Sequence, residues 1–98
     1  MGKNFKSKVY QVVAKIRKGQ VLSYKKVAEM AGNRKAARAV GNILNRHNVK
    51  NLPCHRVVCS NGYVGGYRGG IRKKTELLKK EGVKIDDKGR INLLCFLH

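Results

Sequence analysis

The chain has 98 residues, a length that fits one domain with a thin hydrophobic core. Its 23 Lys and Arg against 5 Asp and Glu give a formal net charge of +18, which indicates a polyanionic partner, above all a nucleic acid. Three cysteines without regular spacing argue against a disulfide framework, and no apolar run approaches the roughly 20 residues that cross a bilayer. We therefore expect a cytoplasmic monomer that associates with DNA, and no membrane partner.

The first predicted helix spans residues 4–18, because apolar residues recur there at steps of three and four and share one face. These residues are Phe5, Val9, Val12, Val13 and Ile16. Gly19 is a natural end for this helix. Ser23 is a suitable N-cap for a second helix, because its hydroxyl can accept a free backbone N–H of the first turn. Gly32 ends the second helix.

A third helix is predicted from about Arg34 to Asn45, with Asn33 as its cap. Its buried side consists of Ala36 or Ala37, Val40, Ile43 and Leu44. Its opposite side is polar and basic, with Arg34, Arg38, Gly41, Asn42 and Asn45. Two helices joined by a short turn that contains glycine describe a helix-turn-helix, and the third helix would be its recognition helix.

Residues 46–70 are predicted to be mostly loop, with a short strand at 56–59 and a tight turn at Asn61-Gly62. A last helix fits Ile71 to Glu81. Residues 83–85 and 91–93 would then pair as a small hairpin that serves as a wing. The predicted fold class is mainly α: one winged helix-turn-helix-like domain, residues 1–98, with short β-hairpins.

The chemistry is concentrated in Pro53-Cys54-His55-Arg56-Val57-Val58. A nucleophilic cysteine reacts as its thiolate, and nearby cations such as His55 and Arg56 lower the thiol pKa. If this segment is extended, successive side chains point to opposite faces, so His55 would reach Cys54 only through a bridging water or after a bend at Pro53. Cys59 is interpreted as structural and Cys95 as incidental.

A zinc site is not expected, because no Cys-x-x-Cys is present and the spacing of the Cys and His residues fits no familiar finger. Glu81 falls near the C-terminus of the last helix, where a negative charge is unfavourable. That conflict indicates a specific partner for Glu81.

The Pro-Cys-His-Arg-Val motif resembles the active-site signature of the O6-alkylguanine-DNA alkyltransferases, also called methylated-DNA–protein-cysteine methyltransferases. The similarity runs from about residue 5 to residue 93 and resembles the family's C-terminal DNA-binding and active-site domain. The other matching segments are Val21-Leu22-Ser23-Tyr24, Ala28 to Gly32, Ala36 to Gly41, Gly65-Gly66-Tyr67, Gly69-Gly70 and Lys74 to Gly82. The chain departs from the family in beginning almost at this domain, so we expect the family's N-terminal domain to be absent. The loop before Cys54 is also one residue shorter than usual, and Arg68 sits where smaller residues are frequent.

The resemblance implies a single-turnover transfer of an alkyl group from O6-alkylguanine in DNA to Cys54, without cofactor or metal. His55 would be the base, acting through a water, and Glu81 would hold the imidazole. Tyr24 would donate a proton or hydrogen bond to the leaving base. The base would have to be flipped out of the duplex, because O6 of a stacked guanine is poorly placed for attack.

The resemblance also implies that the recognition helix enters the minor groove of double-stranded DNA and that Arg38 is the finger that replaces the flipped base. The further DNA contacts would be Ser23, Arg34, Ala36, Ala37, Ala39, Gly41 and Asn42. The base pocket would be lined by Pro53, Val57, Tyr67 and Arg68, with the family's hinge asparagine at His47 or Asn48.

Two other functions are compatible with this architecture. Alkyltransferase-like proteins bind O6-alkylguanine and recruit excision repair, but they replace the acceptor cysteine, which this chain retains. A sequence-specific winged-helix regulator would need side chains that reach base edges, and Ala36, Ala37 and Gly41 are poor ones.

Overall fold

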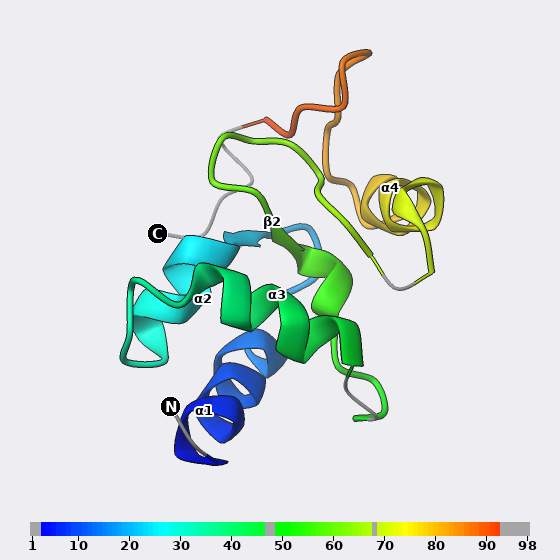
Figure 1. Cartoon of the computed structure of the whole chain (residues 1–98). Helices are drawn as coiled ribbons and strands as arrows, with labels where there is room; N and C mark the ends of the chain where they lie inside the picture. Colours follow the sequence, from blue (N-terminus) through cyan, green and yellow to red (C-terminus); the bar gives the residue numbers. More distant parts are fainter. Residues whose placement is uncertain (1–2, 47–48, 68, 93–98) are drawn as a thin grey trace.

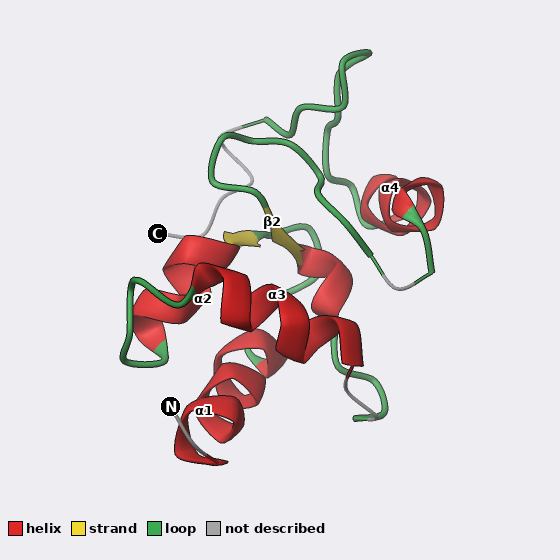
Figure 2. Ribbon diagram, in the orientation of Figure 1, coloured by secondary structure: helices red, strands yellow, loops and turns green. Residues whose placement is uncertain are grey.

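The computed structural model describes residues 3–46, 49–67 and 69–92 of the chain (Figure 1). Its elements are the helices α1 (Lys3–Ala14), α2 (Tyr24–Met30), α3 (Ala37–Arg46) and α4 (Ile71–Lys80), the 3-10 helix η1 (Cys54–Arg56), and the strands β1 (Leu22–Ser23) and β2 (Val57–Val58). Helices and loops dominate and the strands are very short (Figure 2). The prediction of a mainly α fold is confirmed.

The main core lies between α1, α2 and α3. It includes the apolar face predicted for the first helix, with Phe5, Val9, Val13 and Ile16 buried. The helix itself stops at Ala14 rather than at residue 18. Beyond it, the backbone N–H groups of Lys15 and Ile16 bond three residues back, which tightens the last turn before the chain leaves the helix. Ile16 nevertheless keeps its predicted place in the core.

Helices α2 and α3 form the predicted pair. The Ser23 hydroxyl accepts the backbone N–H of Lys26 at 2.9 Å, which confirms Ser23 as the N-cap of α2. Helix α3 begins at Ala37, three residues later than predicted. The reason is a turn: the Asn33 side chain accepts from Lys35 N at 3.1 Å, and Ala36 N donates to the Asn33 carbonyl at 3.0 Å.

The sheet is parallel, with Leu22 opposite Val57 and Ser23 opposite Val58. This pairing, which the sequence did not predict, ties the entry to α2 to the segment that follows Cys54. A second cluster of buried side chains packs between the sheet, the loop after it and α4, and consists of Val21, Val58, Val64, Leu78, Val83 and Ile91.

The predicted wing is present in reduced form. Single antiparallel bridges join Ile85 to Ile91 and Tyr63 to Arg90. Residue 93 of the predicted hairpin, like the tail 94–98 with Cys95, lies outside the described residues. In the described part of the chain, no helix has the length and apolar character needed to span a membrane.

Candidate active site

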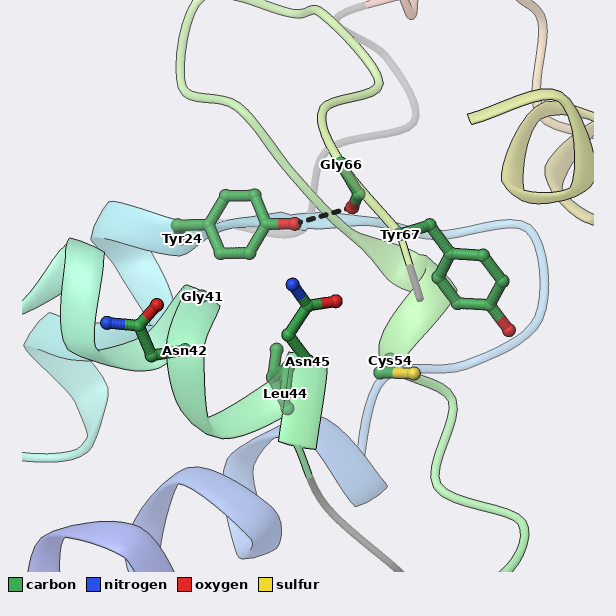
Figure 3. A pocket seen from close by; sticks show the side chains of 8 residues that line it. All are labelled: Tyr24, Gly41, Asn42, Leu44, Asn45, Cys54, Gly66 and Tyr67. Atoms are coloured by element: carbon green, nitrogen blue, oxygen red, sulfur yellow. Dashed lines mark hydrogen bonds between the residues drawn. The ribbon is translucent and has the colours of Figure 1, made fainter. Parts of the chain in front are cut away.

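Cys54 faces a cavity of about 210 Å³ (Figure 3). The cavity lies between α3, η1 and the loop that precedes α4, and its lining residues are Tyr24, Gly41, Asn42, Leu44, Asn45, Cys54, Gly66 and Tyr67. The thiol is half-buried and forms no disulfide with another described cysteine. The structure therefore brings together five predicted site residues from separate parts of the sequence: Tyr24, Gly41, Asn42, Cys54 and Tyr67.

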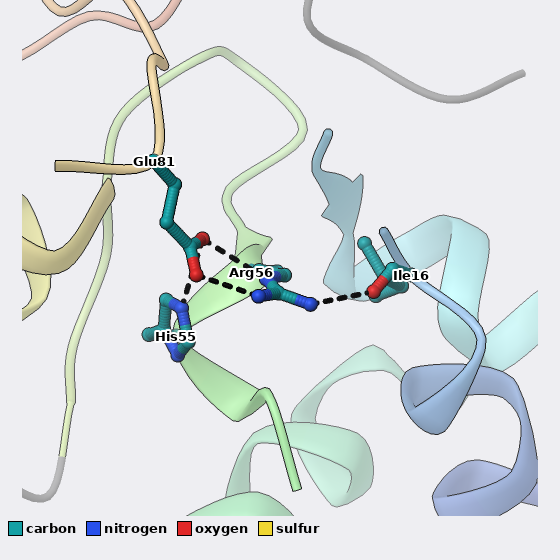
Figure 4. A network of polar contacts seen from close by, with 4 residues as sticks. All are labelled: Ile16, His55, Arg56 and Glu81. Carbon is teal, nitrogen blue, oxygen red and sulfur yellow. Dashed lines mark hydrogen bonds and ion pairs between the residues drawn. The ribbon is translucent and has the colours of Figure 1, made fainter. Parts of the chain in front are cut away.

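The segment around Cys54 is not extended. Cys54, His55 and Arg56 form the 3-10 helix η1, in which Arg56 N donates to the Pro53 carbonyl at 3.0 Å. With three residues per turn, consecutive side chains leave such a helix in different directions. Cys54 accordingly lines the cavity (Figure 3), while His55 and Arg56 both reach the Glu81 carboxylate (Figure 4).

This network centres on the carboxylate of Glu81 (Figure 4). His55 Nε2 lies 3.0 Å from Glu81 Oε1, and Arg56 donates to the two carboxylate oxygens at 2.9 Å from Nε and 2.6 Å from Nη2. The three side chains are only 11–16% exposed. Arg56 Nη1 also donates to the Ile16 carbonyl at 2.8 Å, which satisfies an acceptor left free where α1 ends. The partner predicted for Glu81 is thus found, with a second one in Arg56.

The hydrogen bonds to Glu81 determine the direction in which its pKa is shifted. Burial alone would raise the pKa of this carboxyl, but the hydrogen bonds from Arg56 and His55 hold the pKa below its ordinary value. A carboxylate that accepts from Nε2 favours the imidazole tautomer with its proton on that nitrogen and leaves Nδ1 as an acceptor. Arg56 had been predicted to act as a cation beside the thiol, but its guanidinium is committed to Glu81 and Ile16.

Two residues that line the cavity, Tyr24 and Gly66, contact a buried lysine that the sequence did not predict. Lys74 of α4 is fully buried, and its Nζ donates to the Tyr24 hydroxyl at 3.2 Å and to the Gly66 carbonyl at 3.0 Å. The Tyr24 hydroxyl donates to the same carbonyl at 3.2 Å. The one available signal was spacing: Lys74 precedes the buried Leu78 by four residues and so lies on the same face of α4.

Burial shifts the pKa values of both Lys74 and Tyr24. It lowers the pKa of Lys74 to about 8, against the opposing influence of Cys59 and Cys54. It raises the pKa of Tyr24 to about 12, together with the same two thiol groups. At neutral pH the phenol therefore keeps its proton. Tyr67 also has a raised pKa, because of burial first and then its interactions with Cys54, including a hydrogen bond.

Most of the predicted DNA contacts are at least partly exposed to solvent. Arg34, Arg38 and Asn42 are exposed, and Ala37, Ala39 and Gly41 are half-buried. The other two predicted contacts expose little side chain: Ala36 is 5% exposed and packs in the core, and Ser23 is buried with its hydroxyl engaged in the cap of α2.

The predicted pocket residues are corrected in the same way. Val57 belongs to β2 and is fully buried in the core, so its side chain does not reach the cavity. Pro53 is half-buried and precedes η1 as its N-cap residue. His47, Asn48 and Arg68 lie outside the described residues. Among the residues that the structure describes, no group of three or more His, Cys, Asp or Glu side chains could hold a metal ion.

Gly65 marks the tightest point of the loop beside the cavity. Its φ is +79°, and an added Cβ would lie 3.0 Å from Cys59 Sγ. We expect Gly65→Ala to lower the free energy of unfolding by about 1–3 kcal/mol, through backbone strain and this contact, as measured by urea denaturation. Gly66→Ala is the control, because a Cβ there meets nothing within 4 Å. Equal free energies of unfolding for Gly65→Ala and Gly66→Ala would contradict the expected backbone strain and close contact at residue 65.

A protein-family model described as the DNA binding domain of 6-O-methylguanine DNA methyltransferase matches residues 4–83 of the chain. Among relatives, the methylated-DNA–protein-cysteine methyltransferase of Homo sapiens is 45% identical over 82 residues, which cover 83% of this chain and 40% of the relative. That of Saccharolobus islandicus is 42% identical over 84 residues, which cover 85% of this chain and 54% of the relative. The chain thus spans about half the length of these relatives, or less.

Two solved structures show the same fold. The crystal structure of S. pombe Atl1 in complex with damaged DNA containing O6-carboxymethylguanine has a TM-score of 0.83 at 27% identity and covers 100% of this chain and 98% of that one. Mycobacterium tuberculosis OGT in complex with DNA has a TM-score of 0.73 at 40% identity, over 83% of this chain and 51% of that one.

Proposed function

The chain belongs to the 6-O-methylguanine DNA methyltransferase family, whose DNA-binding domain it contains, and on this premise we propose that it repairs DNA by moving an alkyl group from O6 of guanine onto Cys54. The observation that carries the proposal is the placement of the Cys54 thiol. Cys54 faces a cavity walled by two tyrosines and sits next in sequence to an imidazole anchored on a carboxylate.

The thiolate forms by proton transfer to His55. Because Glu81 accepts from Nε2, the lone pair of Nδ1 is free to take the proton, and the opposite directions of the two side chains call for a bridging water. Arg56 acts as a positioning residue, since its two bonds to Glu81 fix the carboxylate that orients the ring.

The transfer itself is a substitution at the alkyl carbon. The Cys54 sulfur forms the new bond, the bond from carbon to O6 breaks, and the electron pair moves into the guanine ring. Tyr24 supplies a proton or hydrogen bond to the base, and Lys74 already donates to the Tyr24 oxygen on which negative charge would develop. The product is a thioether, which is not a leaving group under these conditions, so each chain acts once. The step requires no cofactor.

DNA binding is assigned to the outer face of α3. Arg38 and Asn42 are exposed on α3, with the small Ala39 and Gly41 between them, and Arg34 is exposed in the turn that precedes the helix. Small residues and one reaching arginine suit the narrow minor groove, and the net charge of +18 supplies phosphate contacts. A guanine flipped from the duplex would enter the cavity beside Gly41 and Asn42, which line its rim.

Arg38→Ala should weaken binding of duplex DNA containing O6-methylguanine and slow transfer by about 10- to 100-fold, because a side chain that fills the gap of the flipped base is lost. Fluorescence anisotropy and single-turnover rates measure the two effects. Lys79→Ala, an exposed cation in the last turn of α4, is the control for charge alone. Arg38 has no finger role if both variants behave alike.

Intact-protein mass spectrometry tests the proposal as a whole. After incubation with O6-methylguanine duplex, the wild-type chain should gain the mass of one methyl group, and Cys54→Ala should gain none. The similarity to S. pombe Atl1 over the whole of both chains favours a second candidate function, a sensor that binds the lesion without transfer. Tight binding of the lesion duplex with no mass gain in the wild-type chain would select the sensor.

A further inference from the structure

A second hollow, of about 410 Å³, lies where α1 packs against β1 and the end of α2. Helix α1 contributes Lys8, Gln11 and Val12, the turn just after it contributes Lys15, and the other side contributes Leu22 and Met30. None of these residues lines the cavity at Cys54. We call this hollow the α1–α2 groove.

The α1–α2 groove combines an apolar floor with basic edges. Val12, Leu22 and Ala31 form part of the floor, and Met30 is 53% exposed, which is high for a large apolar side chain. Lys8, on α1, and Lys15, in the turn directly after α1, are both exposed and lie seven residues apart. At the rise of an α-helix, seven residues span roughly 10 Å. No Asp or Glu is among the residues that line the groove in the described part of the chain.

We propose that the α1–α2 groove binds an acidic, amphipathic segment of a partner protein. An apolar stripe on such a segment would cover Met30 and the floor, and carboxylates two turns apart would meet Lys8 and Lys15. A second copy of the chain fits poorly, because each copy carries a net charge of +18 and would repel the other. DNA also fits poorly, since a phosphate backbone would pair with the lysines but leave the apolar floor uncovered. The inference does not depend on transfer to Cys54.

The probe is a synthetic, fluorescein-labelled peptide of about 14 residues, helical, with Leu along one face and Glu on both flanks. Binding to the full chain is followed by fluorescence anisotropy. The double variant Lys8→Glu/Lys15→Glu should bind it about tenfold more weakly or worse. The control is Lys79→Glu/Lys80→Glu, which changes the net charge equally on exposed positions of α4 and should alter the affinity by less than about threefold.

A second peptide, in which Ser replaces every Leu, separates groove binding from general attraction between charges, and it should bind about tenfold more weakly. Circular dichroism of both charge variants verifies that they fold. Equal losses in the two variants, or equal affinity for the two peptides, would overturn the proposal and leave only non-specific polyanion binding.

Two further results would assign the groove to another occupant and also overturn the proposal. The first is peptide binding that appears only after residues 94–98 are deleted, which would place the chain's own tail in the groove. The second is a dimer in sedimentation equilibrium that Met30→Lys converts to a monomer, which would place a second copy there.

Discussion

Cys54→Ser should abolish alkyl transfer while leaving the affinity for O6-methylguanine duplex within about threefold. A serine hydroxyl is un-ionised at neutral pH and is a far weaker nucleophile than a thiolate, so the single-turnover rate should fall by a factor on the order of 10⁴ or more. Binding should persist, because the outer face of α3 is unchanged and the substitution is nearly isosteric. Quenched-flow transfer and fluorescence anisotropy give the two values.

Cys59→Ser is the matched control for this variant. Cys59 is likewise half-buried, but it packs near Gly65 outside the lining of the cavity. Transfer should continue in this variant at a rate within a few-fold of the wild type. If Cys59→Ser loses transfer and Cys54→Ser keeps it, the assignment of the nucleophile is wrong.

Arg56→Met should lower the free energy of unfolding by about 2–4 kcal/mol. The variant removes both bonds to the Glu81 carboxylate and the bond to the Ile16 carbonyl, and leaves a poorly solvated negative charge with His55 as its remaining partner in this network. Transfer should slow as well, since the carboxylate that orients His55 is less well fixed. Urea denaturation and single-turnover rates measure the two losses.

A double-mutant cycle measures the interaction between Arg56 and Glu81 separately from the other contacts of the network. Arg56→Met/Glu81→Met removes both charges, so it should lose less stability than the sum of the two single variants. Additive losses would show that Arg56 and Glu81 do not interact as the geometry indicates.

The lowered pKa of Glu81 also predicts a dependence of stability on pH. Because the folded protein binds this proton less readily than the unfolded chain, the ionised carboxylate stabilises the fold above its ordinary pKa of 4.5. That stabilisation is lost as the pH falls through the lower, folded pKa. In urea denaturation, the free energy of unfolding should therefore fall more steeply below pH 4.5 in the wild type than in Glu81→Gln. If the free energies of unfolding of the two proteins fall in parallel with pH, the lowered pKa of Glu81 would be contradicted.

Features encoded in short segments could be predicted from the sequence. Ser23 was predicted as an N-cap because a hydroxyl before an apolar helix acts within its own first turn, and the hydrogen bond to Lys26 confirms it. The buried face of the first helix followed from its spacing alone. The motif identified the segment with Cys54 and His55. The unfavourable place of Glu81 at a helix end indicated that it has a partner, and the family resemblance implied that the partner is His55.

Features that depend on distant residues could not be predicted. The pairing of Leu22 with Val57 joins strands of two residues, too short for a periodic pattern. Lys74 is a lysine on a strongly charged helix, which normally indicates a solvated face, and only the phenol of Tyr24 and the carbonyl of Gly66 explain its burial. The role of Arg56 was misassigned because proximity in sequence to Cys54 says nothing about direction in a 3-10 helix.

Tryptic peptide mapping after reaction with excess O6-methylguanine duplex tests the central claim most directly. Trypsin cuts after Lys50, Arg56 and Arg68, so Cys54 and Cys59 fall on separate peptides, residues 51–56 and 57–68. We expect the 51–56 peptide to carry one methyl group on sulfur, at a yield that levels off at one group per chain, with the 57–68 peptide unmodified. An unmodified 51–56 peptide from protein that has bound the lesion, or a methyl group found on 57–68 instead, would contradict the account.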